Sequence, residues 1–544
     1  MLDDNYYLRN FEALIGFVAE TYADVLTGAE NDWQRAVLGA SEPARRLYIR
    51  LLGRQGEVFR LSKLKYPEIS SIAAAASELE ALALVSATAP VDIEAISALF
   101  TKPELIRLLT LTGANQSKRG AIVDAIVEKN APQDLLKLQQ ADAFVTIRGK
   151  AEFALFKLCF FGNGYQDMSE FVLRDLGVFS YEPYPITRHS RVFGHRDQID
   201  AHLLCMACGT ALESTDVNDA DALITLTNAL PSNLHNDPHL GRRVDRIRNH
   251  VARQLERIEK LEEAELLYRR STHPPARERR VRVLMKLKQF HEAADLCESM
   301  LQQPITEEEV QFVETIQPKL RRQMNLPAIK KTRFKPNTSK LTLSNADERV
   351  EFTAKKFFSQ YGDCYYVENS LINGVLGLFI WDIIFAAVEG VFYNPFQSAP
   401  ADFYQPEFCT KRSALIEQRF TELDDTLQFS ARVWDNFESR SGTVNPLVNW
   451  NMLSSEILSC ALIRIPVEHW RLLFTRILSD LKRNTSGLPD LILFPRSGGY
   501  ELLEIKGPGD AVQKNQRRWM AYFAEHRIPY RVIHIRWGKQ AESV

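Results

Sequence analysis

Gly487-Leu-Pro-Asp-Leu-Ile-Leu-Phe-Pro-Arg-Ser-Gly-Gly-Tyr-Glu-Leu-Leu-Glu-Ile-Lys-Gly507 is the stretch that decides the fold of the C-terminal part of this chain. Residues 491–494 and 501–506 are rich in Leu, Ile and aromatic side chains, which is typical of β-strands. Between them, residues 496–499 read Arg-Ser-Gly-Gly, which is the composition of a turn. The stretch therefore predicts a two-stranded hairpin.

Three polar side chains of this hairpin, Asp490, Glu504 and Lys506, are expected to converge. If the strands pair antiparallel, Asp490 lies roughly opposite Lys506, and Glu504 lies one step along the same face, because side chains alternate with period two. Two carboxylates and a backbone carbonyl, here that of Ile505, are the oxygen ligands that Mg²⁺ or Mn²⁺ prefers. A lysine beside such an ion orients or deprotonates an attacking water, so the hairpin has the minimum equipment for metal-dependent phosphodiester cleavage. An ordinary charge pattern on a solvated strand remains the simpler alternative.

The residues after Lys506 favour the catalytic interpretation. Gly507-Pro-Gly-Asp510 ends the strand, residues 511–525 are expected to be helical, and residues 527–537 form an apolar strand. The expected helix places polar and aromatic side chains at three- and four-residue spacing, namely Gln513, Gln516, Trp519 and Phe523. A hairpin, a helix and a further strand make a small mixed sheet with a helix across it, and active sites gather at such strand ends.

This pattern resembles the VRR-nuc branch of the PD-(D/E)xK nuclease superfamily, in which Pro-Asp is followed by Glu-x-Lys-Gly-Pro and by a glutamine on the next helix. A second segment, residues 365–385, has Glu368 ahead of Gly377-Leu-Phe-Ile-Trp-Asp-Ile-Ile-Phe385. With this segment the chain is similar to full-length members of the Fanconi-associated nuclease family. Its compactness is typical of a bacterial member.

The resemblance implies a role for each matched residue. Asp490 and Glu504 would be the principal metal ligands, Glu368 an additional metal-site carboxylate, and the Ile505 carbonyl a further ligand for one or two Mg²⁺ or Mn²⁺ ions. Lys506 would be catalytic, and Gln516 would position the site. Without the resemblance, Glu368 is only an acid in the first turn of a buried helix, where it favours the helix dipole.

The fold class that follows is a multidomain, mainly α-helical protein with a C-terminal α/β nuclease domain, a mixed sheet flanked by helices. Its parts are expected to be a helical DNA-binding domain at 1–90, a SAP-like DNA-binding unit at 91–132, a scaffold of helical repeats similar to tetratricopeptide repeats at 133–326, a basic linker at 327–345, and the nuclease domain at 346–544. The repeats are predicted from two similar segments, Leu261–Tyr268 and Phe290–Cys297, whose offset of 29 residues is shorter than that of a regular tetratricopeptide array.

Composition indicates an ordinary large globular protein. The 544 residues are 45% hydrophobic and 25% charged, which suggests three or four domains. No signal-peptide segment opens the chain and no apolar run reaches membrane-spanning length, so a cytoplasmic protein without a membrane partner is expected. The seven scattered cysteines indicate a reducing compartment, and the isolated Cys205-x-x-Cys208 is interpreted as core rather than metal site.

The net charge of −2 hides two basic tracts. Residues 241–290 hold fifteen Lys or Arg against seven Asp or Glu, a local net charge of +8, and residues 317–340 hold eight more basic residues and no acid. Basic tracts beside a phosphodiesterase core favour a local track for phosphates. The alternative is that these side chains only solvate exposed helix faces.

Two further basic clusters are expected to contact DNA backbone. In the N-terminal domain, where the family has a DNA-binding unit, the candidates are Arg45, Arg46, Arg50, Arg54, Lys63 and Lys65. In the SAP-like unit, Lys118 and Arg119 begin the second helix and would face phosphates. Arg188, Arg191 and Arg196, ahead of the repeats, are further candidates.

The resemblance implies a structure-specific, metal-dependent DNA endonuclease whose partner is branched DNA, mainly 5' flaps. It also implies a 5' to 3' exonuclease activity, a place in interstrand-crosslink repair and, in a bacterium, association with the nucleoid. The alternatives are a DNA-binding scaffold built on repeats, with a weak nuclease domain, and a nuclease of related fold acting on junctions or on RNA. A missing carboxylate or lysine would favour the scaffold, and all are present.

Overall fold

The structure, a computed structural model, divides into two compact units. Unit 1 comprises residues 1–178 and 186–203, and unit 2 comprises residues 179–185 and 204–544. The described residues are 6–111, 117–164, 166, 180–232, 237–328, 334–344 and 348–538. Each unit is considered by itself.

Unit 1 is helical around a small sheet of strand order β1-β3-β2. β3 (Phe144–Ile147) pairs antiparallel with β1 (Val58–Arg60) and with β2 (Val85–Ser86). The α-helices are α1 (Tyr6–Thr21), α2 (Gly28–Gly39), α3 (Glu42–Leu52), α4 (Ile72–Ala81), α5 (Ile93–Ser97), α6 (Lys102–Leu109), α7 (Arg119–Lys129), α8 (Pro132–Gln140) and α9 (Lys150–Phe161). Because β3 returns to strands that precede residue 91, the SAP-like segment is inserted between two strands of one sheet. The repeats expected from residue 133 therefore begin further along the chain.

The SAP-like segment has its two expected helices, α6 and α7, and residues 112–116 of the loop between them lie outside the described residues. These helices share one apolar core with α5 and α8, centred on Ile96, Phe100 and Leu105. The segment is thus a small helical bundle, and its assignment as a SAP unit stays a prediction.

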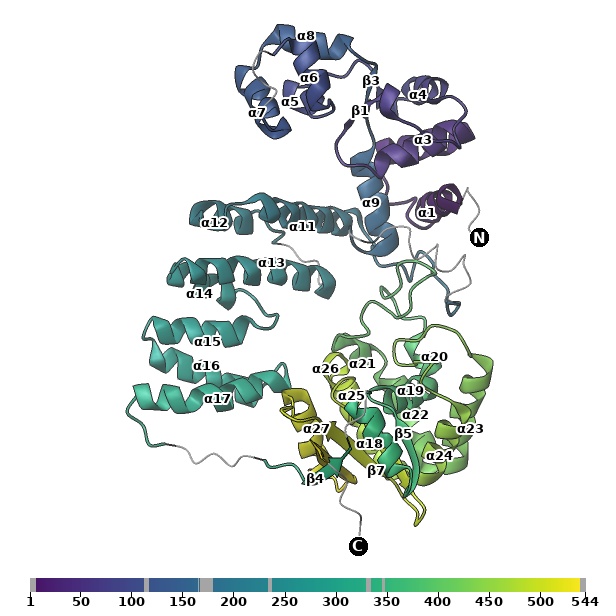
Figure 1. Ribbon diagram of the computed structural model, residues 1–544, viewed down its shortest axis with the longest axis vertical. Helices are drawn as coiled ribbons and strands as arrows, with labels where there is room; N and C mark the ends of the chain where they lie inside the picture. The colour runs from purple at the N-terminus through teal and green to yellow at the C-terminus, as the bar shows by residue number, and fades with distance from the viewer. Residues whose placement is uncertain are drawn as a thin grey trace. The chain divides into compact units, whose positions relative to one another are not determined.

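The helical array of unit 2 stacks consecutive helices against one another (Figure 1). Its helices are α12 (Ala220–Asn228), α13 (Pro238–Arg257), α14 (Leu261–Arg269), α15 (Ala276–Lys286), α16 (Phe290–Gln302) and α17 (Glu307–Gln323), preceded by α11 (Arg196–Ser214). Ala264 and Ala293, the small residues of the two similar segments, are fully buried where neighbouring helices approach. Cys205 and Cys208 on α11 are buried and free, as expected of core residues. Whether the array belongs to the tetratricopeptide class stays a prediction.

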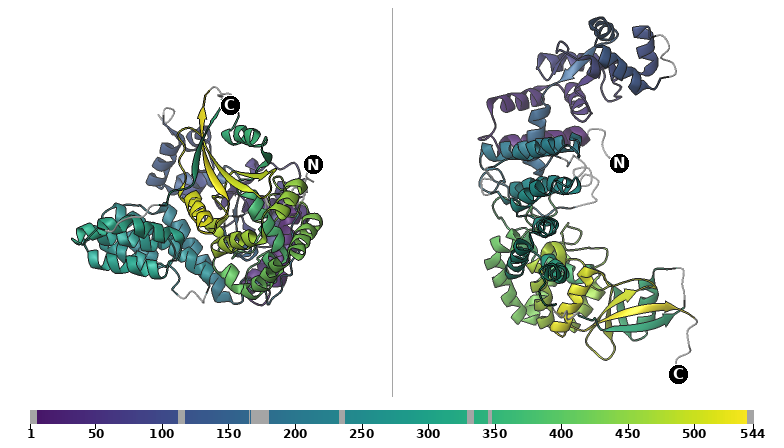
Figure 2. Two further views of the ribbon diagram at one scale, coloured as in Figure 1. Left: turned by 90° about the horizontal axis from the view of Figure 1, so that it is seen from below. Right: turned by 90° about the vertical axis from the view of Figure 1, so that its left-hand side faces the viewer.

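The C-terminal domain contains a five-stranded mixed sheet of order β4-β8-β7-β6-β5. Its strands are β4 (Thr338–Leu343), β5 (Gly362–Tyr366), β6 (Leu491–Pro495), β7 (Glu501–Lys506) and β8 (Tyr530–Trp537). β4, β8 and β7 run parallel, and β6 is antiparallel to both of its neighbours. Leu503 and Ile505 on one face pack against Phe358 of α18 (Val350–Phe358), and α27 (Lys514–Glu525) contacts the other face at Glu504 (Figure 2).

β4 lies within the segment that the sequence predicts to be a linker. Its side chains alternate between exposed Thr338, Lys340 and Thr342 and less exposed Ser339, Leu341 and Leu343, as in an edge strand. Of this segment, residues 329–333 and 345–347 lie outside the described part, and they include Lys330, Lys331 and Arg333 of the second basic tract. A strand is present because β8, far along the chain, supplies a partner for it.

Helices inserted between β5 and β6 surround the apolar α19 (Ser370–Phe379). They are α20 (Trp381–Ile384), α21 (Glu407–Lys411), α22 (Ser413–Thr421), α23 (Thr426–Ser439), α24 (Ser455–Arg464), α25 (Val467–Ser479) and α26 (Leu481–Asn484). All ten residues of α19 except the first are buried. In the described ranges no helix, α19 included, is both long enough and apolar enough to cross a membrane.

Candidate active site

Asp490 is the residue directly before β6, on a loop held by several contacts. Gly487 has φ +87°, and a Cβ there would lie 2.9 Å from the side-chain nitrogen of Asn515 on α27, so the loop requires glycine at this position. The Leu488 amide donates to Asn369 Oδ1 at 3.1 Å. The Ile505 amide donates to Asp490 Oδ2 at 2.8 Å, which ties the Asp490 carboxylate to β7.

The register of β6 with β7 corrects the predicted one. Leu491 pairs with Leu503, and continuing this register by one residue sets Asp490 opposite Glu504 rather than opposite Lys506. Leu493 pairs with Glu501, so the connection between the paired positions runs over residues 494–500, which is longer than the turn at 496–499 predicted from the sequence, and Phe494 and Pro495 pair with β5 alone. The two carboxylates are thus direct neighbours across the strands, and Lys506 lies one step along.

Glu504 is the centre of the site. Its carboxylate is 1% exposed, and its Oε1 atom accepts both Lys506 Nζ at 2.7 Å and Gln516 Nε2 at 2.5 Å. Its Oε2 atom is buried and has no hydrogen-bond partner among the described residues. A buried polar atom without a partner is costly, so this oxygen is available for a ligand that the protein does not supply.

Burial shifts the acidity of both carboxylates. Loss of solvation raises the pKa of Asp490 to about 6 and that of Glu504 to about 8, and for Glu504 the nearby charge of Asp490 is the second cause. The charge of Lys506 acts in the opposite direction on both groups without outweighing burial. Two adjacent carboxylates that resist ionisation are a site that a cation stabilises.

Gln516 has two functions on the first turn of α27. Its Oε1 atom accepts the Gln513 amide at 2.9 Å, which caps the helix, and its Nε2 atom donates to Glu504. The amide therefore links the start of α27 to the buried carboxylate, and the positioning role that the resemblance implies stays a prediction.

Glu368 contacts the site through its backbone. It lies two residues before α19, outside the helix in which it was expected. Its amide and that of Val367 donate to the Asp490 carbonyl at 3.0 and 2.9 Å. Glu368 has φ +35°, a left-handed conformation that is strained for a residue with a long side chain. The side chain is exposed, and one of its oxygens accepts the hydroxyl of Tyr366.

The donor set fits a divalent cation, although the side chains are not gathered as a finished coordination shell. Among the described residues, no group of three or more His, Cys, Asp or Glu side chains stands close enough to hold a metal ion. Among the described residues, Glu504 Oε2 has no hydrogen-bond partner, and the pKa values of Asp490 and Glu504 are both raised. A hard cation bound between the two carboxylates would give this oxygen a partner and would stabilise the ionised form of both groups. The residues present are therefore suited to Mg²⁺ or Mn²⁺.

Sequence reasoning missed three residues beside the site. Glu351, in the first turn of α18, raises the pKa of both Asp490 and Glu504 through its charge. Tyr366 ends β5 and contacts Glu368, and Arg349 precedes α18 and contacts Tyr366. The sequence offered one signal for them, namely that they lie at the start of a helix and at the end of a strand. Only the order of strands in the sheet brings these two ends beside the hairpin.

The basic residues expected to bind DNA in unit 1 mostly serve the fold. Arg45 pairs with Glu12 at 2.8 Å, Arg46 with Glu42 at 2.5 Å, Arg50 with Glu68 at 2.7 Å and Lys63 with Glu104 at 3.2 Å. Arg54 donates to the Tyr66 hydroxyl, Arg119 to backbone carbonyls of Ala98 and Phe100, Arg191 pairs with Asp24, and Arg196 pairs with Glu30. Lys65 and Lys118 are exposed, as is Arg188.

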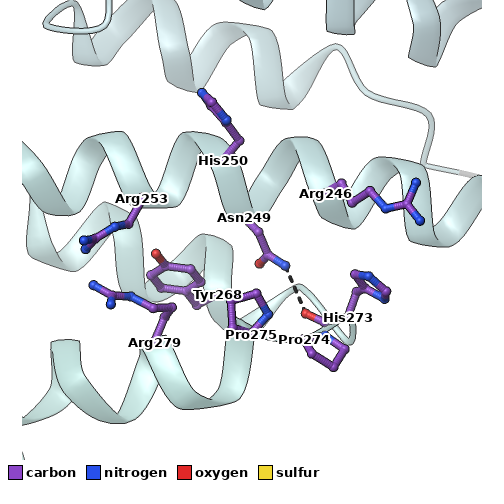
Figure 3. A pocket seen from close by; sticks show the side chains of 9 residues that line it. All are labelled: Arg246, Asn249, His250, Arg253, Tyr268, His273, Pro274, Pro275 and Arg279. Atoms are coloured by element: carbon purple, nitrogen blue, oxygen red, sulfur yellow. Dashed lines mark hydrogen bonds between the residues drawn. The ribbon is translucent and has the colours of Figure 1, made fainter. Parts of the chain in front are cut away.

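Part of the +8 charge of the array is also matched internally. Arg253 and Arg279 both pair with Glu256, and Arg269 and Arg280 both pair with Glu265. A pocket of about 420 Å³ opens beside the first of these clusters (Figure 3). It is lined by Arg246, Asn249, His250, Arg253, Tyr268, His273, Pro274, Pro275 and Arg279. The local charge available to a phosphate is therefore smaller than the sequence count.

Comparisons with known proteins agree with the site. The VRR-NUC domain model matches residues 425–537, and the model described as FAN1, HTH domain matches residues 5–86. The chain is 34% identical over 548 residues to the Fanconi-associated nuclease 1 homolog of Pseudomonas aeruginosa, which covers 98% of this chain and 96% of that protein. Human Fanconi-associated nuclease 1 is 29% identical over 177 residues, 31% of this chain and 17% of that protein.

Solved structures give the same result. The crystal structure of paFAN1 bound to 2nt 5'flap DNA with gap has a TM-score of 0.85 and 32% sequence identity, and the match covers 99% of this chain and 100% of that chain. The crystal structure of paFAN1 bound to 1nt 5'flap DNA with gap has a TM-score of 0.83 with the same coverage.

Proposed function

We propose, from the premise that this chain belongs to the Fanconi-associated nuclease family, that it is a structure-specific DNA nuclease that hydrolyses phosphodiester bonds at 5' flaps and related branches. The observation that carries the proposal is the buried group of Asp490, Glu504 and Lys506, in which Glu504 Oε2 has no hydrogen-bond partner within the part of the chain that the structure describes. Every residue of the nuclease motif is present in the sequence, which argues against an inactive DNA-binding scaffold.

The metal would be held by Asp490, Glu504, the Ile505 carbonyl and Glu368. The oxygen donors suit one or two Mg²⁺ or Mn²⁺ ions. When bound, such an ion polarises the scissile phosphate and makes a bound water more acidic.

The residues of the chain supply positioning and charge. Lys506, held against Glu504 at 2.7 Å, orients the attacking water and offsets the negative charge that develops on the phosphate, with a 3'-hydroxyl as leaving group. Gln516 holds Glu504 Oε1 and keeps the carboxylate from turning away. Asp490 is fixed by the Ile505 amide, so the two carboxylates keep their spacing during the reaction.

Selection of DNA shape belongs to the remaining domains. We assign backbone contacts to exposed cations, Lys65, Lys118 and Arg188, and to the pocket of the array with Arg246 and His250. A scaffold of repeats and a SAP-like unit would then hold branched DNA while the nuclease domain cuts it. The proposal includes three further properties that only the family resemblance implies: a 5' to 3' exonuclease activity, a role in interstrand-crosslink repair and, in a bacterium, a place at the nucleoid.

Cleavage of labelled DNA tests the proposal. Wild-type protein should cut 5'-flap DNA in the presence of Mg²⁺ or Mn²⁺ and should cut nicked and single-stranded DNA less well. Asp490→Ala and Glu504→Ala should each abolish cleavage and leave DNA binding nearly unchanged, because both side chains belong to the proposed reaction centre and neither is among the cations assigned to DNA contacts. Cleavage by either variant at the wild-type rate would sink the assignment.

A further inference from the structure

Glu368 needs outside support if it is to act as a ligand. Its backbone is held in a strained conformation by the bond from its amide to the Asp490 carbonyl, but its side chain is exposed. A long exposed carboxylate loses conformational freedom when it binds an ion, and that loss weakens binding. A contact that fixes the carboxylate beforehand removes part of this cost.

Tyr366 provides that contact from the end of β5. Its hydroxyl donates to Glu368 Oε2 in a short hydrogen bond. The ring is itself fixed, since it packs on Phe352 of α18 with centroids 5.2 Å apart and Tyr366 pairs with Leu491 of β6. The hydroxyl thus reaches Glu368 from the end of a strand of the sheet, and Tyr366 lies two residues before Glu368 in the chain.

Arg349 adds a cation to the same contact. One of its terminal nitrogens donates to the Tyr366 hydroxyl at 3.4 Å, and its guanidinium lies 5.6 Å from the centre of the Tyr366 ring and 5.7 Å from that of Phe352. Its Nε atom lies 3.4 Å from Glu351. A donor on the hydroxyl oxygen polarises the O–H bond and strengthens its bond to a carboxylate.

We propose that Tyr366, assisted by Arg349, is a positioning residue that orders the Glu368 carboxylate for metal binding, so that the site is partly assembled before the ion arrives. The proposal rests on the metal-dependent nuclease function proposed above. Second-layer hydrogen bonds of this kind commonly change metal affinity or activity by about 10- to 100-fold.

A single-atom deletion tests this. Tyr366→Phe keeps the ring on Phe352 and removes only the hydroxyl. We expect the dissociation constant of Mn²⁺ for the free protein, measured by titration calorimetry or by Mn²⁺ electron paramagnetic resonance, to rise about 10-fold. The Mn²⁺ concentration for half-maximal cleavage should rise in parallel, and saturating Mn²⁺ should restore most of the rate.

The neighbouring tyrosine gives a matched control. Tyr365 points to the opposite face of β5, where its ring packs on Phe494 and its hydroxyl lies 4.0 Å from the Cys460 sulfur. Tyr365→Phe removes the same atom one residue away and should leave Mn²⁺ affinity unchanged. Equal Mn²⁺ affinity of wild type and Tyr366→Phe, with both folded by circular dichroism, would overturn the proposal.

A double-mutant cycle tests the part played by Arg349. Arg349→Ala should weaken Mn²⁺ binding in the wild-type background and have almost no further effect in Tyr366→Phe, because the arginine acts through the hydroxyl. Additive effects would show that Arg349 acts on the site independently and would contradict the proposal that it acts through the Tyr366 hydroxyl.

The binding measurement separates this proposal from the nuclease function. Glu368→Gln should weaken Mn²⁺ binding at least as much as Tyr366→Phe. A Glu368→Gln protein that binds Mn²⁺ with wild-type affinity would overturn the positioning role of Tyr366. The nuclease function would still be tested by cleavage with the Asp490→Ala and Glu504→Ala variants. If Mn²⁺ binding by the wild-type protein depends on Tyr366 but the protein cuts no DNA, the proposed nuclease function is contradicted and the positioning role of Tyr366 is supported.

Discussion

Glu504 is a carboxylate whose position is set by three neighbours of different chemistry. Burial and the charge of Asp490 raise its pKa, while Lys506 and Gln516 hold one of its two oxygens. The other oxygen has no partner among the described residues, so the protein fixes the direction of the carboxylate without satisfying it. A site of this kind gains most from a ligand that brings positive charge.

Removing the amide that holds Glu504 should slow the reaction without unfolding the domain. Gln516→Ala should lower the cleavage rate of flap DNA about 10-fold, because Glu504 Oε1 loses a donor and the carboxylate can turn. Steady-state cleavage at several Mn²⁺ concentrations measures this. Gln513→Ala removes the other side chain of the capping box at this helix start, leaves the Gln513 amide in place and serves as the control. Equal rates for the two variants would mean that Gln516 acts only as a helix cap.

A methyl group at Gly487 should destabilise the loop that carries Asp490. Gly487→Ala combines an unfavourable φ with a close approach to Asn515, and together these should cost about 2–4 kcal/mol. Gly390→Ala has a similar φ of +73° but open space, so it should cost only about 1 kcal/mol. Thermal unfolding followed by circular dichroism compares them, and equal losses would show that the contact with Asn515 is unimportant.

At the scale of elements, the start of α17 is joined to the nuclease helices by ion pairs. Glu307 accepts both terminal nitrogens of Arg476 at 3.1 Å and lies 3.2 Å from Arg518, and Glu308 pairs with Arg483 at 2.9 Å. Arg476 also stacks on the rings of Trp519 and Tyr522 in α27. Because α27 also carries Gln516, the last helix of the array braces the element that holds Glu504.

Removing Glu307 should loosen α27. Glu307→Ala leaves Arg476, which is 9% exposed, without its carboxylate, and an unpaired buried charge is strongly unfavourable. Amide hydrogen exchange of α27 should become about 10-fold faster, which corresponds to roughly 1.4 kcal/mol of local stability. Glu314→Ala, an exposed position on the same helix, is the control. Unchanged exchange in α27 would show that the ion pairs do not support it.

The elements also show what the sequence could and could not predict. The hairpin, α27 and β8 follow from local patterns of apolar residues and turns, and the structure confirms them. The register was wrong by two residues because the connection between β6 and β7 begins at Phe494, inside the apolar run, where β6 still pairs with β5, and the hairpin sequence alone does not show that pairing. β4 was taken for linker because its partner lies at the other end of the domain. The backbone of Glu368 and its contact with Tyr366 depend on the Asp490 loop, and no local pattern encodes them.

At the scale of the whole molecule, charge is distributed differently from what a count along the chain indicates. The family and the nuclease function were predicted from the motif and are confirmed by relatives that span the chain. Basic clusters, in contrast, suggested many DNA contacts, yet carboxylates distant in sequence pair with four of the candidate arginines of the N-terminal unit, Arg45, Arg50, Arg191 and Arg196. Counting charges cannot reveal pairs that only the fold creates.

One histidine between the array and the nuclease domain should make stability depend on pH. Burial and then the charge of Arg242 lower the pKa of His239 to about 4, although Asp237 and Asp402 nearby act in the opposite direction and Arg243 acts with Arg242. The folded protein therefore binds this proton less tightly than the unfolded chain, and the free energy of unfolding falls as pH drops from about 6.5 towards 4.

Substitution of His239 should flatten that dependence. The melting temperature of His239→Gln should fall less between pH 7.5 and about pH 5 than that of wild type, because Gln takes up no proton. His250→Gln, an exposed histidine of the same helix, should leave the dependence as in wild type. Parallel curves for wild type and His239→Gln would contradict the prediction.

The pairing of β4 with β8 determines when the catalytic domain can exist during protein synthesis. β4 and β7 are joined only through β8, which is the latest of the five strands to leave the ribosome. The N-terminal unit closes its own small sheet once β3 has emerged, long before the nuclease sheet is complete. A nascent chain therefore completes the sheet of its N-terminal unit before the nuclease sheet can form, and any product of interrupted translation that stops before β8 would lack the strand that joins β4 to β7.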